Sequence, residues 1–237
     1  MANGDAFDHA VNLARENPSL DVGCHLVLVG GRSLLEPYDS LPQSVPELLA
    51  AIVSRKLRVK DELTAQVRRI LSAGLAPTHI DTHKHTHLAP PVLAAVAEIA
   101  QEFGILWVRR PFDLPVTAAR GTAPFLKRVT SDGLELLRGR FHRVLQDHHC
   151  RMTDHFAGFQ LTGRFRTAEL VQLIYELPEG TTEFMCHPGR CGEQLRHAKT
   201  RLKESRAEEL AALVAPETKQ ALVEHGVRLE NYRDLSE

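Results

Sequence analysis

The chain has 237 residues, 43% hydrophobic and 25% charged, and 29 basic residues nearly balance 30 acidic ones, for a formal net charge of −1. This composition is typical of a globular protein and excludes a disordered chain. It shows no basic excess that would predict a nucleic-acid partner or an anionic membrane surface. No apolar run approaches the ~18 residues of a membrane span. The 13 histidines, several of them clustered, are the unusual feature.

The cysteines and the first residues indicate a cytoplasmic protein. The first eighteen residues have neither a basic n-region nor a hydrophobic h-region. The four cysteines have no CxxC spacing and are too few to staple a chain of this size, so we expect them to be reduced. A thiolate pair of Cys186 and Cys191 is the less favoured alternative, because no other thiol spacing indicates zinc.

Short apolar runs alternate with helical stretches along the chain. In chain order, we expect helices over 5–16, 45–55, 60–73, 90–103, 131–147, 167–176, 203–213 and 216–225. We expect strands over 21–29, 78–82, 105–109, 153–157, 182–187 and 226–229. Strands separated by helices predict an α/β fold with a mainly parallel sheet, either open or closed as a β/α barrel. In both forms the loops at the carboxyl ends of the strands carry the chemistry.

The strongest signal is the segment His-Ile-Asp-Thr-His-Lys-His-Thr-His over residues 79–87. His79, Asp81, His83, His85 and His87 occupy every second position, so they share one face while the backbone stays extended. Imidazoles with a carboxylate among them suit Zn, Mn, Fe or Ni, and five such groups on an apolar sheet are costly unless they are solvated, hydrogen-bonded or bound to metal. The alternative is a solvated loop with a chance run of histidines.

Two further histidines stand where strands are expected. His25 lies inside the apolar run 22–29, where a histidine is more often a satisfied core residue than a ligand. A catalytic metal, however, needs ligands from different strands, and His25 is a natural donor to meet His83. His187 follows the strand before Pro188 and is either a structural cap or, beside a metal, a general acid that titrates near neutral pH.

Other catalytic motifs are absent from the sequence. It contains no GxSxG, GxGxxG, GxxxxGK[ST] or HExxH pattern. Arg138, Arg140 and Arg143 could attract an acidic or phosphorylated substrate, but a solvated helix face explains them better.

Four blocks of the sequence resemble the YdjC-like carbohydrate deacetylases. They are Asp-Val-Gly-Cys-His-Leu-Val-Leu from 21, Pro-Thr-His-Ile-Asp-Thr-His-Lys-His-Thr-His from 77, Glu-Phe-Met-Cys-His-Pro-Gly from 183, and Arg-Leu-Glu-Asn-Tyr-Arg-Asp-Leu from 228. The resemblance runs from residue 3 to 235 in the family's order. The histidine-rich and Met-Cys-His-Pro-Gly blocks are its most specific parts.

The resemblance implies a β/α-barrel-like fold, a divalent metal such as magnesium or zinc, and hydrolysis of an N-acetyl amide on an amino sugar. The family's metal histidines correspond to His25 and His83, and its catalytic-site histidine corresponds to His187. A metal would polarise the acetyl carbonyl and activate a water, a carboxylate would take the water's proton, and His187 could protonate the leaving amine. We expect Asp81 and His85 to support this site or contact substrate.

Asp154 is expected either to line the substrate cleft or to make a structural hydrogen bond. The substrate implied is an N-acetylated sugar or glycolipid, with no nucleic acid and no membrane span.

The sequence departs from the family pattern at its start. The family opens with an Asn-Ala-Asp-Asp-Phe-Gly-like block that supplies an aspartate ligand and the base, and this chain has no such block. We therefore expect one domain over 1–237 that lacks the family's first strands, through a start codon assigned too late or a real truncation. Missing strands would expose sheet edges, and pairing between such edges is a route to a homodimer. We expect weak or no deacetylase activity from this polypeptide alone.

Two other functions compete with the deacetylase. One is an inactive family member that binds metal or carbohydrate without turnover. The other is an unrelated barrel hydrolase that uses His83 and His85 as its metal pair. Substitution of His25 separates the deacetylase model from the barrel-hydrolase model, because only the deacetylase model uses His25 as a ligand and predicts loss of metal.

Overall fold

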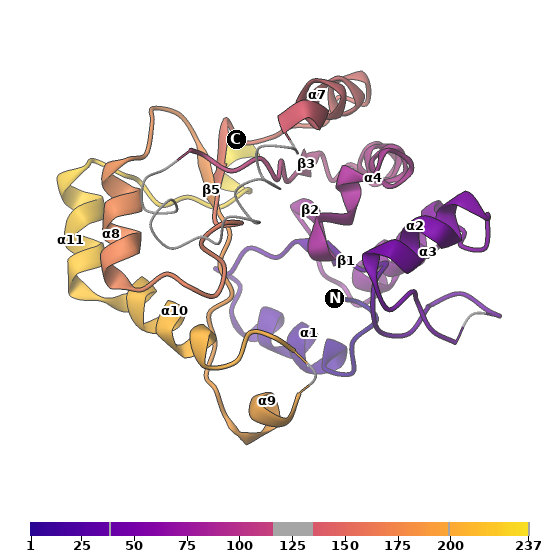
Figure 1. Ribbon diagram of the computed structural model, residues 1–237, viewed down its shortest axis with the longest axis horizontal. Coiled ribbons are helices and arrows are strands. Elements are labelled where there is room, and N and C mark those ends of the chain that lie inside the picture. Colours follow the sequence, from indigo (N-terminus) through magenta and orange to yellow (C-terminus); the bar gives the residue numbers. More distant parts are fainter. Residues whose placement is uncertain (38, 116–134, 199, 237) are drawn as a thin grey trace. The chain divides into compact units, whose positions relative to one another are not determined.

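A computed structural model describes residues 1–37, 39–115, 135–198 and 200–236, and they form two compact units (Figure 1). The first unit comprises Met1–Arg109, Gly139–Met152 and Glu230–Glu237, and the second comprises Arg110–Arg138 and Thr153–Leu229. The assignment of 1–237 to a single domain stays a prediction.

The first unit is built around a parallel sheet of three strands in the order β1-β2-β3. Its strands are β1 (Cys24–Leu26), β2 (His79–Thr82) and β3 (Trp107–Val108). Its helices are α1 (Phe7–Glu16), α2 (Val45–Val53), α3 (Val59–Ser72), α4 (Pro90–Phe103) and α7 (Arg138–Asp147), with 3-10 turns η1 (His83–Leu88) and η3 (Asp234–Ser236). An isolated parallel bridge joins Trp107 to Arg151.

Helices α3 and α4 contact each other, and α3 also contacts β1. Both helices repeat apolar residues at helical spacing, and their fully buried side chains include Leu63, Val67, Val96 and Ile99. Because burial of a Val, Leu or Ile side chain contributes about 1.5–3 kcal/mol, this stripe holds the helices in place. The resulting core places the carboxyl ends of β1 and β2 side by side.

Strand β1 ends at Leu26, although its apolar sequence continues to Val29. The side chain of Gln66, wholly buried on α3, accepts from the Val27 N–H at 2.8 Å and donates to the Val27 carbonyl at 2.7 Å. Buried backbone groups must find partners, and an amide side chain supplies both here in place of a neighbouring strand. The strand expected over 21–29 is therefore real but shorter.

The second unit contains a parallel pair of strands, β4 (His155–Ala157) and β5 (Thr182–Phe184). Its helices are α8 (Thr167–Tyr175), α9 (Glu193–His197), α10 (Glu204–Val214) and α11 (Pro216–Glu224), with the 3-10 turn η2 (Glu135–Leu137). Helices α8, α10 and α11 contact one another (Figure 1). Their apolar faces enclose a core that includes Leu161, Phe165, Leu170, Ile174 and Ala221.

The expected helices are found at 5–16, 45–55, 60–73, 90–103, 167–176, 203–213 and 216–225, each within a few residues of its predicted bounds. For the helix expected over 131–147, residues 131–134 lie outside the described residues. The strand expected over 226–229 is wrong. Gly226 has φ +66°, and the Val227 N–H donates to the carbonyl of Leu222 at 2.8 Å, so this segment closes α11 instead of pairing with a strand.

The parallel α/β architecture is confirmed. Within the described ranges, strand pairing covers β1-β2-β3 and β4-β5, without closure into a barrel. None of the described helices combines the length and the apolar character needed to cross a lipid bilayer.

Candidate functional site

His25 and Asp81 face each other because β1 and β2 are parallel and in register, with His25 opposite Asp81. His25 Nδ1 lies 2.8 Å from Asp81 Oδ2. A carboxylate only accepts hydrogen bonds, so in the neutral ring the proton is on Nδ1 and Nε2 carries the lone pair. The pairing therefore selects the imidazole tautomer whose Nε2 can bind a metal.

The second ring nitrogen of His25 meets His83, the first residue after β2. His25 Nε2 lies 3.4 Å from His83 Nδ1, and the two rings are T-shaped with centroids 5.6 Å apart. Two nitrogens bound at ~2.0–2.1 Å to a tetrahedral zinc ion would be ~3.3–3.4 Å apart. The separation of these two nitrogens thus suits a shared metal ion, and a carboxylate behind a ligating histidine is a common arrangement in metal sites.

Two histidines do not complete a metal site. In the described parts of the chain, no group of three or more His, Cys, Asp or Glu side chains is arranged to hold a metal ion. His25 and His83 fit as two ligands, and a third protein ligand is not among the groups that the described residues bring together.

Arg109, just past β3, pairs with the same oxygen of Asp81 that contacts His25. Both the Asp81 and Arg109 side chains are largely buried, at 7% and 13% exposure. Burial alone would raise the pKa of Asp81, but the hydrogen bond from His25 and the charge of Arg109 outweigh it, and the pKa lies well below its usual value. Asp81 is therefore ionised at neutral pH. Sequence reasoning missed Arg109, although its place at the carboxyl end of an expected strand was a usable signal.

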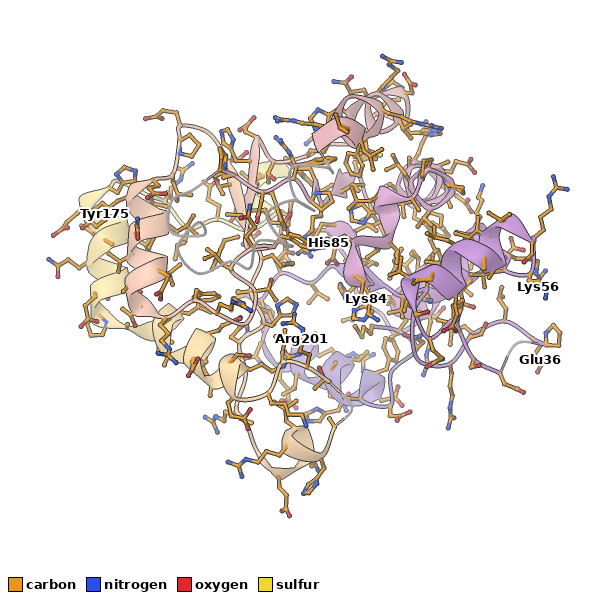
Figure 2. All side chains as sticks on the ribbon, viewed as in Figure 1. Glu36, Lys56, Lys84, His85, Tyr175 and Arg201 are labelled. Carbon is orange, nitrogen blue, oxygen red and sulfur yellow. The ribbon has the colours of Figure 1, made fainter. Side chains whose placement is uncertain are left out.

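The alternating pattern over 79–87 does not put five side chains on one face. Strand β2 ends at Thr82, and η1 follows with Lys84 at φ +55° and His85 at φ +51°, a left-handed conformation that is costly for residues other than glycine (Figure 2). His79, at the opposite end of β2, stacks on Tyr232 with ring centroids 4.2 Å apart. The shared-face interpretation is wrong because the extended backbone ends after Thr82.

His87, which belongs to the same turn, is wholly buried. Its Nε2 lies 3.0 Å from the backbone carbonyl of Arg109, and its Nδ1 lies 2.6 Å from Thr82 Oγ1. Burial lowers the pKa of His87 to about 4, despite the opposing effect of the bond to Arg109, and burial lowers the pKa of His85 to about 3. Both rings are neutral at pH 7 and serve the packing of the turn.

His187 belongs to the second unit, where a buried carboxylate holds its backbone. The His187 N–H donates to Glu209 Oε2 at 2.6 Å, and Glu209 Oε1 accepts from the Gly163 N–H at 2.7 Å. Glu209 on α10 is fully buried, and Arg206 donates to the His187 carbonyl at 3.3 Å. The loop after β5 is thus held by its main chain. No sequence pattern distinguished Glu209 from the solvated charges around it.

Asp154 makes structural hydrogen bonds. Its Oδ2 accepts from the Thr181 N–H and from Thr181 Oγ1, each at 2.8 Å, and these bonds lower its pKa. The turn before Thr181 requires a residue without a side chain, because Gly180 has φ +107° and a Cβ there would lie 2.9 Å from Asp154 Oδ2. Of the two roles expected for Asp154, this geometry supports the structural one.

Comparison with known proteins gives one consistent family. A family model described as YdjC-like protein matches residues 1–224. The chain is 32% identical over 246 residues to a carbohydrate deacetylase of Geobacillus stearothermophilus, which covers 99% of this chain and 84% of that protein. It is 29% identical over 243 residues to one of Brevibacillus brevis, covering 99% and 86%, and 32% identical over 268 residues to one of Mus musculus, covering 99% and 84%.

The fold also matches a solved structure. The crystal structure of an Enterococcus faecalis V583 protein, described as a proposed cellobiose-phosphate cleavage protein, aligns with a TM-score of 0.74 at 22% identity, covering 99% of this chain and 85% of that one. At this identity the likeness shows a shared fold alone.

Proposed function

Because the chain belongs to the YdjC-like family, we propose that it is a metal-dependent hydrolase that removes the N-acetyl group from an N-acetylated amino sugar. The observation that carries the proposal is the approach of His25 Nε2 to His83 Nδ1 at 3.4 Å, with Asp81 behind His25. The relatives named carbohydrate deacetylase support the substrate class.

In this proposal His25 and His83 hold a divalent ion, zinc or magnesium. Imidazole nitrogens favour zinc and similar ions over magnesium, which prefers oxygen ligands. When bound, the ion supplies a Lewis acid for the acetyl carbonyl and makes a water more acidic. Asp81 keeps the lone pair of His25 on Nε2. On the sequence resemblance alone, His187 of the second unit is proposed as a general acid, a role that imidazole side chains serve near neutral pH.

A second candidate is a protein that binds metal or carbohydrate without turnover. It is favoured by one observation: within residues 1–37, 39–115, 135–198 and 200–236, the two imidazoles have no third protein ligand grouped with them. Two imidazoles can bind a divalent ion weakly, whereas a catalytic zinc site uses three protein ligands and keeps one position for water or substrate.

Closure of the strands into a barrel, a cytoplasmic location and a homodimer belong to the same proposal. The parallel pairing of all described strands supports the first of these.

The test uses the full chain, zinc or magnesium, and an N-acetylated chito-oligosaccharide, with acetate release and metal binding both measured. We expect metal binding and at most weak metal-stimulated acetate release. Both should be lost in His25→Ala and kept in His9→Ala, a matched control because His9 is exposed on α1. Metal or sugar binding without acetate release would favour the second candidate. A chain that neither binds metal or sugar nor releases acetate would contradict both candidates.

A further inference from the structure

A continuous set of contacts leads from the buried His87 through Arg109 and Asp81 to His25. It involves residues of β1, β2 and η1 and the segment after β3, all within the first unit. The inference drawn from it rests on the proposed metal site, but not on the identity of the substrate.

The first step fixes the backbone of Arg109. The Arg109 carbonyl can only accept, so His87 must donate from Nε2 at 3.0 Å, and its Nδ1 then accepts from the Thr82 hydroxyl at 2.6 Å. Thr82 Oγ1 accepts in turn from the His87 backbone N–H at 3.1 Å. Every polar side-chain atom of the buried His87–Thr82 pair therefore has a partner, and these partners determine the tautomer of His87. Such satisfied buried networks hold their members in one arrangement.

The second step fixes Asp81. Arg109 Nη1 and His25 Nδ1 both bind Asp81 Oδ2, so the carboxylate cannot turn toward one partner without losing the other. Charge-assisted hydrogen bonds of this kind are about twice as strong as neutral ones. Asp81 directly precedes Thr82 on β2, and the same short segment therefore anchors both His25 and His87.

A second buried aspartate in the first unit shows what a purely structural carboxylate looks like. The Asp21 side chain is 7% exposed, the same as that of Asp81, and it also pairs with an arginine, Arg233, at 3.5 Å. It accepts from the Thr78 hydroxyl at 2.8 Å, and its described contacts include no histidine. Asp21 joins chain segments, whereas Asp81 also determines where the proton lies on an imidazole.

We propose that Asp81, held by Arg109 and His87, is a positioning residue that fixes the tautomer and ring orientation of His25 so that its Nε2 lone pair faces the metal position. Arg109 acts through Asp81, which its guanidinium binds. The general precedent is that residues behind a metal-ligating histidine raise metal affinity ~10–100-fold.

The experiment combines NMR of ¹⁵N-labelled imidazoles with a zinc titration of the full chain. In the wild type we expect His25 as the Nδ1–H tautomer. In Asp81→Asn we expect part or all of the population to shift to Nε2–H, with zinc affinity ~10–100-fold lower. Arg109→Lys keeps the charge but loses the planar guanidinium, and we expect a smaller change in the same direction.

Asp21→Asn is the matched control, and we expect it to lower stability while the His25 tautomer and zinc affinity stay unchanged. The inference is overturned if wild-type His25 is the Nε2–H tautomer, or if Asp81→Asn changes neither the tautomer nor the affinity. A tautomer shift without loss of affinity would also overturn it. If Asp81→Asn does not fold, Arg109→Lys and the wild-type spectrum decide. If the wild type binds no zinc, the proposed metal site fails, while the His25 tautomer still tests this inference.

Discussion

Buried carboxylates hold histidines in both units, but they hold different parts of them. Asp81 binds the ring of His25 through Nδ1, whereas Glu209 binds the backbone N–H of His187. A metal ligand needs one defined tautomer, which a contact to the ring enforces. A proton-transfer group needs a ring that can change its protonation, and Glu209 binds the main chain of His187, the proposed general acid. The two proposed roles thus differ in the atom of the histidine that the carboxylate contacts.

The largest effect expected from this comparison is on metal binding. His25→Ala or His83→Ala removes a proposed ligand, so zinc affinity should fall by more than the ~10–100-fold that loss of a supporting residue costs. His187→Ala should leave zinc affinity unchanged. Isothermal titration of the three variants checks this, and an equal loss in all three would contradict the division of roles.

Glu209 should stabilise the fold of the second unit, because it accepts hydrogen bonds from two backbone N–H groups. Glu209→Ala leaves the half-buried N–H groups of Gly163 and His187 without their acceptor, which should lower the free energy of unfolding by about 3 kcal/mol. The neighbouring Glu208, 43% exposed and paired with Arg166, is the control, and Glu208→Ala should cost less than about 1 kcal/mol. Urea unfolding measures both. Equal losses would show that burial of Glu209 adds nothing.

His87 should make stability depend on pH. Its pKa is lowered from the ordinary value of about 6.5 to about 4 in the folded protein. Between pH 6.5 and pH 4, the unfolded chain therefore binds a proton at this residue more readily than the folded protein does. Above that range the titration of His87 gives the free energy of unfolding no pH dependence, and as pH is lowered through the range this free energy should fall by about 3 kcal/mol.

Replacement by phenylalanine removes this proton. His87→Phe should therefore be less stable at pH 8, where it loses two hydrogen bonds, yet show a shallower fall in stability between pH 6.5 and 4 than the wild type. Exposed His9→Gln should keep the wild-type slope. Urea unfolding at several pH values measures the slope, and an unchanged slope in His87→Phe would contradict the assignment.

The smallest effect expected is at the left-handed turn. Lys84 (φ +55°) is exposed and lies beside His83, and exposed Arg55 (φ +54°) has the same conformation after α2, away from any proposed site. Glycine at either position should raise the free energy of unfolding by up to about 1 kcal/mol, since it removes the strain of a left-handed residue.

The two positions should differ in metal binding. Lys84→Gly should weaken zinc binding by less than ~10-fold because His83 is held less firmly, whereas Arg55→Gly should leave it unchanged. Thermal unfolding and zinc titration check both variants. Equal zinc affinity in the two would show that the turn does not position His83.

The sequence predicted the helices and the parallel strands well, because their apolar spacing and their glycine and proline ends are local signals. It also predicted that His25 and His83 would meet, since adjacent parallel strands bring their ends together. It did not predict that the alternation after Thr82 breaks, because Lys84 and His85 are ordinary residues in a conformation that only the surrounding turn explains. Arg109, Glu209 and Gln66 were missed for a different reason, because their partners are distant in sequence.

The most direct test of the metal site is a zinc titration of the full chain with ¹⁵N-labelled histidines, followed by NMR. The proposal predicts that the Nε2 signal of His25 and the Nδ1 signal of His83 shift together and saturate at one zinc ion per chain, while the signals of His87 and His9 stay in place. Saturation without a shift of either His25 or His83, or shifts confined to other histidines, would contradict it.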